Sequence, residues 1–190
     1  MPIIRIKDIT DPQFAAYREL KDKTLLSRHG LFIAEGEHLV RRLIESEFET
    51  HSMLVQESRL HAFSKASFKF PVFVATAKQI SQIVGFKFHR GVLALGIRKP
   101  LMNVEAMMAD AGKIQRLVIL PEINDVENLG GLFRTCAALG YKFIILGPSC
   151  CDPFARRAIR TSVGTIFKLS ISRSDDIIRD VALLKINHNF

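Results

Sequence analysis

The fold is decided by the stretch Leu117–Leu146, which reads LVILPEINDVENLGGLFRTCAALGYKFIIL. It opens and closes on four-residue apolar runs, Leu117–Leu120 and Phe143–Leu146, which are typical of strands buried in a parallel sheet. Between them, residues 130–139 have a helical pattern that ends at Gly140. A strand, a helix and a second strand in this order predict an α/β fold with a parallel sheet.

The residues after Leu146 continue this alternation. They predict a helix over 152–161, a strand over 165–171 and a last helix over 175–185. Asp152-Pro153 begins the first of these helices, and Ser174 is the predicted cap of the last. No strand follows, although a parallel sheet needs cover on both faces. Residues 114–190 therefore predict the N-terminal part of a larger α/β domain.

A domain boundary is predicted at Lys99-Pro100, because proline disfavours helical backbone at the residue before it. Residues 1–99 predict a separate small α/β domain, with a helix over 35–46 and a strand over 91–97. In this domain, Thr76 and Gln79 form the capping-box pattern of a helix start. Residues 100–113 predict a linker with a helix over 103–110, capped by Asn103.

The chain is basic. Its 27 Lys and Arg residues outnumber 19 Asp and Glu residues, which gives a net charge of +8. Most of the excess precedes residue 100, where 16 basic residues stand against 10 acidic ones. This favours a polyanionic partner such as RNA, because phosphate contacts release counterions. A charge that only keeps the protein in solution is the alternative. No apolar run approaches the ~18 residues that cross a bilayer, so we expect no membrane segment.

Three cysteines, Cys136, Cys150 and Cys151, favour a reducing compartment. An odd number that includes an adjacent pair does not make a disulfide framework, and we therefore expect a cytoplasmic protein. The adjacent pair also lacks the spacing of a zinc site, and no histidine stands nearby. We expect no metal.

A candidate site follows the strand at 117–120, at the sheet edge where open α/β folds bind ligands. Gly130 and Gly131 are expected at the helix start, where bare backbone lets a substrate phosphate approach. Arg134 lies one helical turn beyond Gly130 and is expected to face the same loop mouth as Asn128. A guanidinium there clamps a phosphate or polarises a hydroxyl. The alternative is that the two glycines only make the helix start more flexible and that the arginine is solvated.

Two motifs in this half resemble those of a known family. Residues 125–140 carry D-x-x-N-x-G-x-x-x-R-T-x-A-x-x-G, which resembles the first motif of the SpoU (TrmH-like) RNA ribose 2′-O-methyltransferases. Residues 152–167, DPFARRAIRTSVGTIF, resemble the second motif, an Asp-Pro opening followed by R-x-S-x-G-x-x-F. Residues 32–40 and 89–94 are similar to the opening and the closing strand of the family's N-terminal domain, whose fold is like that of ribosomal protein L30e. The resemblance covers nearly the whole chain.

The resemblance implies an L30e-like RNA-binding domain over 1–99 and an α/β SPOUT domain with a C-terminal trefoil knot. It implies a homodimer that transfers methyl from S-adenosylmethionine to a ribose 2′-hydroxyl of tRNA or rRNA. Arg134 is the residue implied to help activate that hydroxyl, and Asn128 to help build the same site. Because arginine stays protonated, positioning and stabilisation of developing negative charge are the roles that suit it.

The second motif implies further substrate-binding residues. Arg160 and Ser162 are implied to lie close to the reacting hydroxyl. The basic triplet Arg156, Arg157 and Arg160 suits the RNA backbone, with a solvated helix face as the alternative.

The family's third motif, with its Gly-Asn-Glu and Ser-Leu-Asn stretches, is absent from the sequence. In the family those segments form the knot and most of the cofactor site, so the cofactor-binding residues of this chain stay unknown. We therefore expect the 190-residue chain to lack methyltransferase activity as it stands. The alternative is an RNA-binding pseudoenzyme or module that binds no cofactor.

Overall fold

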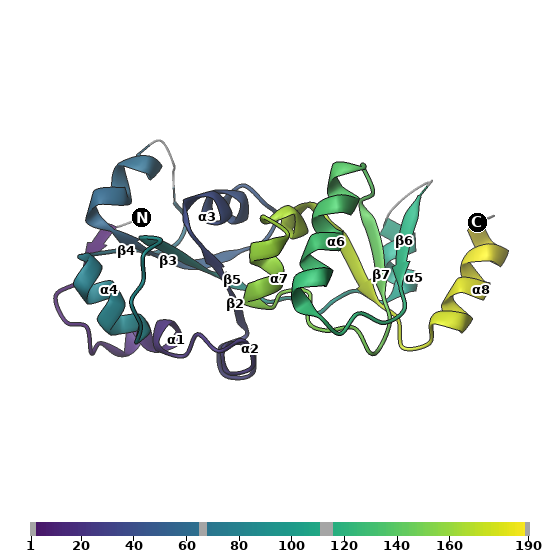
Figure 1. Ribbon diagram of the computed structural model, residues 1–190, viewed down its shortest axis with the longest axis horizontal. Helices are drawn as coiled ribbons and strands as arrows, with labels where there is room; N and C mark the ends of the chain where they lie inside the picture. The colour runs from purple at the N-terminus through teal and green to yellow at the C-terminus, as the bar shows by residue number, and fades with distance from the viewer. Residues whose placement is uncertain (1–2, 65–67, 111–115, 189–190) are drawn as a thin grey trace. The chain divides into compact units, whose positions relative to one another are not determined.

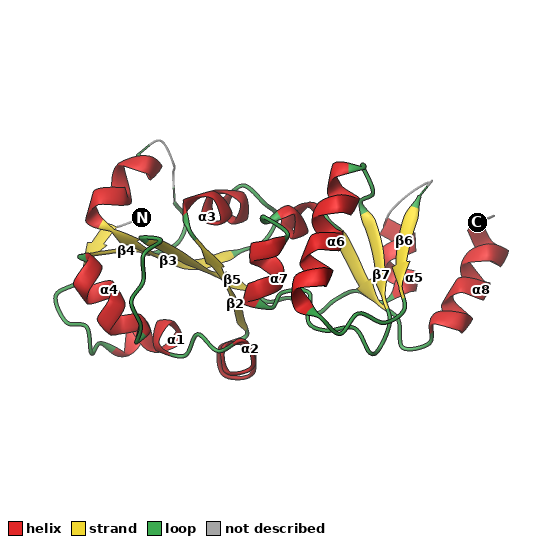
Figure 2. Ribbon diagram, viewed as in Figure 1, coloured by secondary structure: helices red, strands yellow, loops and turns green. Residues whose placement is uncertain are grey.

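The computed structural model describes residues 3–64, 68–110 and 116–188. The chain divides into two compact units, Met1–Lys99 and Pro100–Phe190, and each is described by itself (Figure 1). Both units combine helices with a sheet, so the predicted α/β fold class is confirmed (Figure 2).

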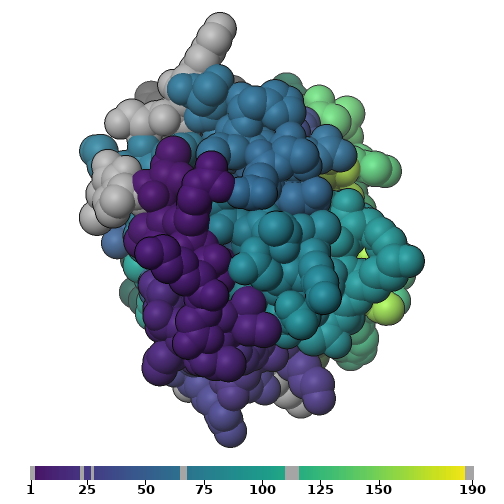
Figure 3. All heavy atoms as spheres, turned by 90° about the vertical axis from the view of Figure 1, so that its left-hand side faces the viewer, coloured from purple at the N-terminus to yellow at the C-terminus, as the bar shows by residue number. Residues whose placement is uncertain are grey.

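Within the described part of the first unit, five strands form a mixed sheet in the order β1-β4-β3-β5-β2. The strands are β1 (Ile3–Arg5), β2 (Leu31–Glu35), β3 (Thr50–Gln56), β4 (Val72–Ala75) and β5 (Val92–Ile97). β4 runs parallel to β1 and β3, whereas β5 runs antiparallel to β2 and β3. Figure 3 shows the N-terminal segment, in purple, lying against the later, teal part of the same unit.

The helices of this unit are short, and α3 and α4 are amphipathic. They are α1 (Ala15–Arg18), α2 (Asp22–His29), α3 (Glu37–Ile44) and α4 (Ala77–Val84), with 3₁₀ turns at Pro12–Phe14 and Glu57–Phe63. The helix expected over 35–46 is shorter because Glu35 completes β2 and Gly36, with φ 90°, separates strand from helix. The predicted capping box is confirmed, since Thr76 Oγ1 accepts from the Gln79 amide at 3.2 Å.

The second unit holds the parallel sheet predicted from the apolar runs. Within its described residues, β6 (Leu117–Leu120), β7 (Phe143–Leu146) and β8 (Ser170–Arg173) pair in parallel in that order. The helices are α5 (Val104–Asp110), α6 (Val126–Ala138), α7 (Arg156–Thr161) and α8 (Ile177–His188). α5 and α8 pack on one face of the sheet through a cluster that includes Met107, Ile145 and Leu184. α6 and α7 lie side by side on the other face (Figure 1).

Several boundaries in this unit differ from prediction. α6 begins at Val126 rather than Gly130, because the Asp125 side chain accepts a hydrogen bond from the Asn128 amide at 2.7 Å and caps the helix earlier. α7 begins at Arg156 rather than Asp152, because Asp152 Oδ1 accepts from the Phe154 amide and holds a turn first.

The third strand and the last helix also differ. The stretch expected as a strand over 165–171 divides into a 3₁₀ helix, Thr165–Lys168, followed by β8. The cap of α8 is Asp176, whose Oδ1 accepts from the Arg179 amide at 3.0 Å. Ser174, the predicted cap, is instead buried, and its hydroxyl has no hydrogen-bond partner among the described residues.

Candidate functional site at the α6–α7 contact

Glycine at position 130 lets the two predicted motifs pack against each other. Gly130 is buried in the interior of α6, where a Cβ would lie 1.9 Å from Thr161 Oγ1 and 2.5 Å from the Ala158 carbonyl oxygen of α7. The expectation that Gly130 and Gly131 begin the helix and expose backbone to a phosphate is therefore wrong for Gly130. Its missing side chain allows α6 and α7 to approach closely.

Ion pairs extend this contact towards the start of α6. Glu127 Oε1 lies 3.6 Å from Arg157 Nη1 and 3.6 Å from Arg160 Nη2. All three side chains are substantially exposed, so these pairs add little to stability. Their effect is to gather two of the predicted RNA-binding arginines beside the first motif. Arg156 is half-buried, at the first turn of the same helix.

Arg134 and Asn128 both lie exposed on α6, but on different sides of it. They are separated by about 9 Å along the helix axis and about 120° around it. Arg134 instead follows Gly130 by one turn, on the side of α6 that faces α7. Among the described residues Arg134 makes no hydrogen bond or ion pair, so its guanidinium is available to a ligand.

Ser162 has a structural position. Its side chain is fully buried, its hydroxyl donates to the Ile159 carbonyl at 2.9 Å, and its oxygen accepts from the Gly164 amide at 3.2 Å. The next residue, Val163, has φ 54°, which is unusual for a β-branched residue. Ser162 therefore shapes the turn that ends α7, and its hydroxyl does not reach solvent.

Sequence reasoning missed Arg173, the last residue of β8. Its Nη1 donates to the carbonyls of Gly147, Pro148 and Cys150, and its Nη2 donates to that of Cys151. These acceptors lie more than 20 residues earlier in the chain, so no local pattern signals the contact. Arg173 thus holds the loop that leads from β7 to α7.

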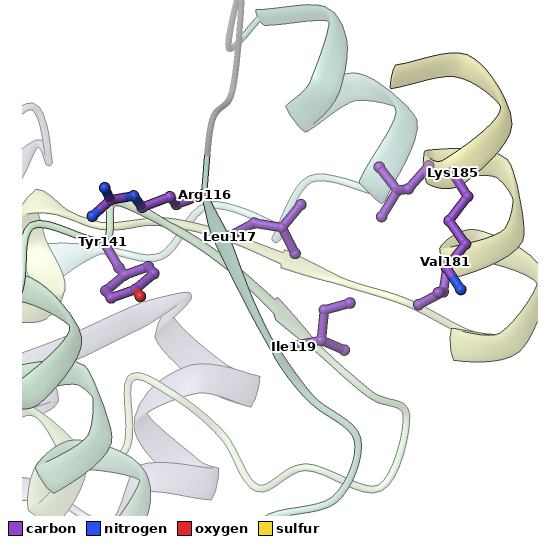
Figure 4. A pocket seen from close by; sticks show the side chains of 7 residues that line it. Arg116, Leu117, Ile119, Tyr141, Val181 and Lys185 are labelled. Carbon is purple, nitrogen blue, oxygen red and sulfur yellow. The ribbon is translucent and has the colours of Figure 1, made fainter. Parts of the chain in front are cut away.

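Two cavities lie on the opposite face of this sheet. One, of about 410 Å³, lies between β6 and α8, where Leu117 and Ile119 point towards Val181 and Lys185 (Figure 4). The other, of about 310 Å³, lies between α5 and α8. Aliphatic side chains form most of the walls of both. Neither cavity is lined by Asn128, Arg134 or the α7 arginines, so both cavities lie apart from the two motifs.

The cysteines are free thiols: Cys136 and Cys150 are buried and Cys151 is half-buried. Burial raises the pKa of the Cys136 and Cys151 thiols, which keeps them protonated near neutral pH. Among the described residues no group of three or more His, Cys, Asp or Glu side chains is placed to hold a metal ion. The helices of the described ranges include none that is long and apolar enough to cross a bilayer.

Comparison with known proteins shows what the chain is similar to. Residues 115–189 match the model of the SpoU rRNA Methylase family. An uncharacterized tRNA/rRNA methyltransferase of Mycobacterium tuberculosis is 30% identical over 95% of this chain and 65% of its own length. A 23S rRNA guanosine 2′-O-methyltransferase of Bacillus subtilis is 22% identical over 89% of this chain and 64% of its own length.

A similar fold is found in the crystal structure of an AdoMet-bound rRNA methyltransferase from Sinorhizobium meliloti. Its TM-score is 0.76 at 22% identity, over 95% of this chain and 69% of that chain. The chain spans about 65% of the length of the mycobacterial relative. The matched segment, residues 115–189, contains β6, α6, β7, α7 and β8 and with them both motifs. This segment is the part of the chain that is similar to the SpoU rRNA Methylase family.

Proposed function

We propose that the chain is the substrate-binding and hydroxyl-activating part of an RNA ribose 2′-O-methyltransferase. The observation that carries the proposal is the α6–α7 contact, in which Glu127 of the first motif meets Arg157 and Arg160 of the second. Arg134 lies exposed on the same helix as Glu127. The names of the mycobacterial and Bacillus relatives, a tRNA/rRNA and a 23S rRNA methyltransferase, support RNA as the substrate class.

The chemistry of these residues suits a ribose hydroxyl. Such a hydroxyl is a poor nucleophile at neutral pH, and it reacts better when its developing negative charge is stabilised. Arg134, exposed and without a partner among the described residues, provides a fixed positive charge for that purpose. Arg157 and Arg160 exchange the carboxylate of Glu127 for RNA phosphates, and they thereby position the ribose next to Arg134.

S-adenosylmethionine is the methyl donor that we propose, on the strength of the family resemblance and of the AdoMet-bound neighbour. Neither of the two cavities is lined by residues of the motifs, so neither is assigned to the donor. Only RNA-facing roles are therefore proposed for residues of this chain.

The remaining assignments follow from the resemblance. Residues 1–99 are proposed to be the L30e-like RNA-binding domain and residues 114–190 to belong to a SPOUT domain that works as a homodimer. The cytoplasm is the proposed location, in keeping with three free cysteines.

The proposal is tested by calorimetric titration with S-adenosylhomocysteine, alongside methyl transfer from radiolabelled S-adenosylmethionine to unmodified tRNA and rRNA transcripts. Where wild-type transfer is measurable, Arg134→Ala should abolish it while the variant stays folded. Unchanged transfer by Arg134→Ala would refute the role of that residue.

The second candidate function is an RNA-binding module without a cofactor. The exposed arginines Arg134, Arg157 and Arg160 favour it, because they can bind RNA phosphates without any methyl donor. It predicts RNA binding with no heat on titration with S-adenosylhomocysteine. It also predicts that Arg134→Ala changes RNA affinity only modestly.

A further inference from the structure

We propose that Arg173 is a positioning residue for the RNA site, because it sets the shape of the loop from which α7 begins. This inference rests on the proposed function. Among the described residues, its guanidinium donates hydrogen bonds to carbonyls of the loop Gly147–Cys151, and it acts on the RNA site through this loop.

The contact consists of one guanidinium and four carbonyl oxygens. Nη1 lies 3.2 Å from the Gly147 oxygen, 3.2 Å from that of Pro148 and 2.9 Å from that of Cys150. Nη2 lies 3.3 Å from the Cys151 oxygen. The loop therefore curls around the cation with its carbonyl dipoles pointing inward. No carboxylate among the described residues pairs with this guanidinium, so the loop dipoles are its main compensation.

The same loop is hydrogen-bonded to the end of β6 and to the loop that precedes α6. The Gly147 amide donates to the Leu120 carbonyl at 2.9 Å, and the Cys151 amide donates to the Ile123 carbonyl at 2.8 Å. The Cys150 thiol also donates to the Leu120 carbonyl. A Cβ at Gly147 would lie 2.0 Å from the Pro121 oxygen, so the two backbones touch directly.

The three parallel strands end at one edge of the sheet, and these contacts join all three ends. α6 and α7 start from the two joined loops, and Glu127 meets Arg157 just beyond those starts. Moving the Gly147–Cys151 loop shifts the start of α7 and with it the arginines proposed to bind RNA. A displacement of the α7 arginines by ~1 Å is enough to weaken their binding to RNA substantially.

Lysine cannot replace this contact. Its ammonium is a compact point charge with three donors, whereas the planar guanidinium has five donors directed in a fixed fork. Arg173→Lys therefore keeps the charge and loses the arrangement. This variant distinguishes the two possible roles of Arg173. A lysine could also contact an RNA phosphate directly, but it could not hold the loop carbonyls in the same arrangement.

The test compares Arg173→Lys and Arg173→Gln with Arg116→Gln, an exposed arginine at the opposite end of the sheet. Circular dichroism first checks that each variant is folded at the assay temperature. The rate at which dithiobis-nitrobenzoate modifies Cys150 and Cys151 then measures how accessible the loop is to solvent. The anisotropy of a fluorescein-labelled unmodified tRNA transcript measures RNA affinity.

We expect both Arg173 variants to react faster with the thiol reagent and to bind the transcript about tenfold more weakly, as for the loss of one charge-assisted interaction. Arg116→Gln should match the wild type in both assays. Faster thiol modification with unchanged RNA affinity would make Arg173 merely structural and overturn the proposal. Wild-type affinity restored by lysine would mean direct phosphate contact and would overturn it too. If the wild-type chain binds no RNA, the proposed function itself is overturned. This outcome differs from failure of the Arg173 proposal alone, in which the wild type still binds RNA.

Discussion

Substituting Gly130 by alanine tests directly whether α6 and α7 are held as closely as described. The new Cβ would lie 2.5 Å from the Ala158 carbonyl oxygen, about 0.9 Å inside the 3.4 Å of an ordinary contact. It would also displace the Thr161 hydroxyl, which now donates to the Arg157 carbonyl at 2.9 Å. Overpacking of this kind costs about 1–3 kcal/mol, and the lost hydrogen bond about 1 kcal/mol more. The higher helix propensity of alanine returns about 1 kcal/mol.

The neighbouring glycine is a matched control. A Cβ at Gly131 meets nothing within 4 Å, so Gly131→Ala should stabilise α6 by about 0.5–1 kcal/mol. The net loss for Gly130→Ala is about 1–3 kcal/mol, so the two variants should differ by roughly 2–4 kcal/mol.

Native-state amide hydrogen exchange of α6 and α7 is the suitable assay, because it measures opening of these helices separately from the first unit. Its result should parallel RNA affinity, which we expect Gly130→Ala to lower and Gly131→Ala to leave unchanged. Equal protection of the helices in the two variants would refute the close contact.

Three further predictions concern the cap of α6, the charge beside the arginines and a histidine in the first unit. Asp125→Ala should destabilise α6 by about 1 kcal/mol, because the Asn128 amide loses its acceptor; hydrogen exchange of α6 measures this. Glu127→Gln should raise RNA affinity about two- to tenfold in the anisotropy assay, because it removes a competitor for Arg157 and Arg160 while changing stability by less than about 1 kcal/mol. Partial burial lowers the pKa of His51 below its ordinary 6.5, so the unfolded chain takes up this proton at a higher pH than the folded one. The stability of the first unit should therefore fall between pH 7 and pH 5 in urea denaturation, and less steeply in His51→Gln.

Each of these predictions has a contrary outcome. Unchanged exchange in the Asp125 variant would mean that α6 does not depend on its cap. Weaker RNA binding by Glu127→Gln would mean that the carboxylate orients the arginines rather than competing for them. The same pH slope in the wild type and in His51→Gln would assign the acid response to other groups.

Features governed by local sequence were predictable. The capping box at Thr76 and Gln79 lies within one helical turn, and the strands β6 and β7 follow from uninterrupted apolar runs. The family motifs also gave the residues that meet across the α6–α7 contact, although ordinary helix patterns do not show which faces touch.

The misses have two physical causes. Capping side chains explain the starts of α6 and α8. Asp125 accepts from the Asn128 amide and starts α6 earlier than predicted, whereas Asp176 accepts from the Arg179 amide and starts α8 later than the predicted cap Ser174 would. Contacts between distant segments explain the rest. β1 is placed by pairing with β4, and Arg173 by carbonyls of a loop that precedes it by more than 20 residues. Neither contact can be recognised from the residues adjacent to it in the sequence.

In the proposed function, α7 presents its arginines to RNA beside the first motif. The most direct test is the salt dependence of tRNA-transcript affinity for the wild type and for the double variant Arg157→Gln/Arg160→Gln. Each lost phosphate contact should reduce the slope of log affinity against log salt by roughly 0.7–0.9. For the two lost contacts we therefore expect a reduction of about 1.4–1.8, together with weaker binding. An unchanged slope and affinity would contradict it, and would place the RNA on another surface of the chain.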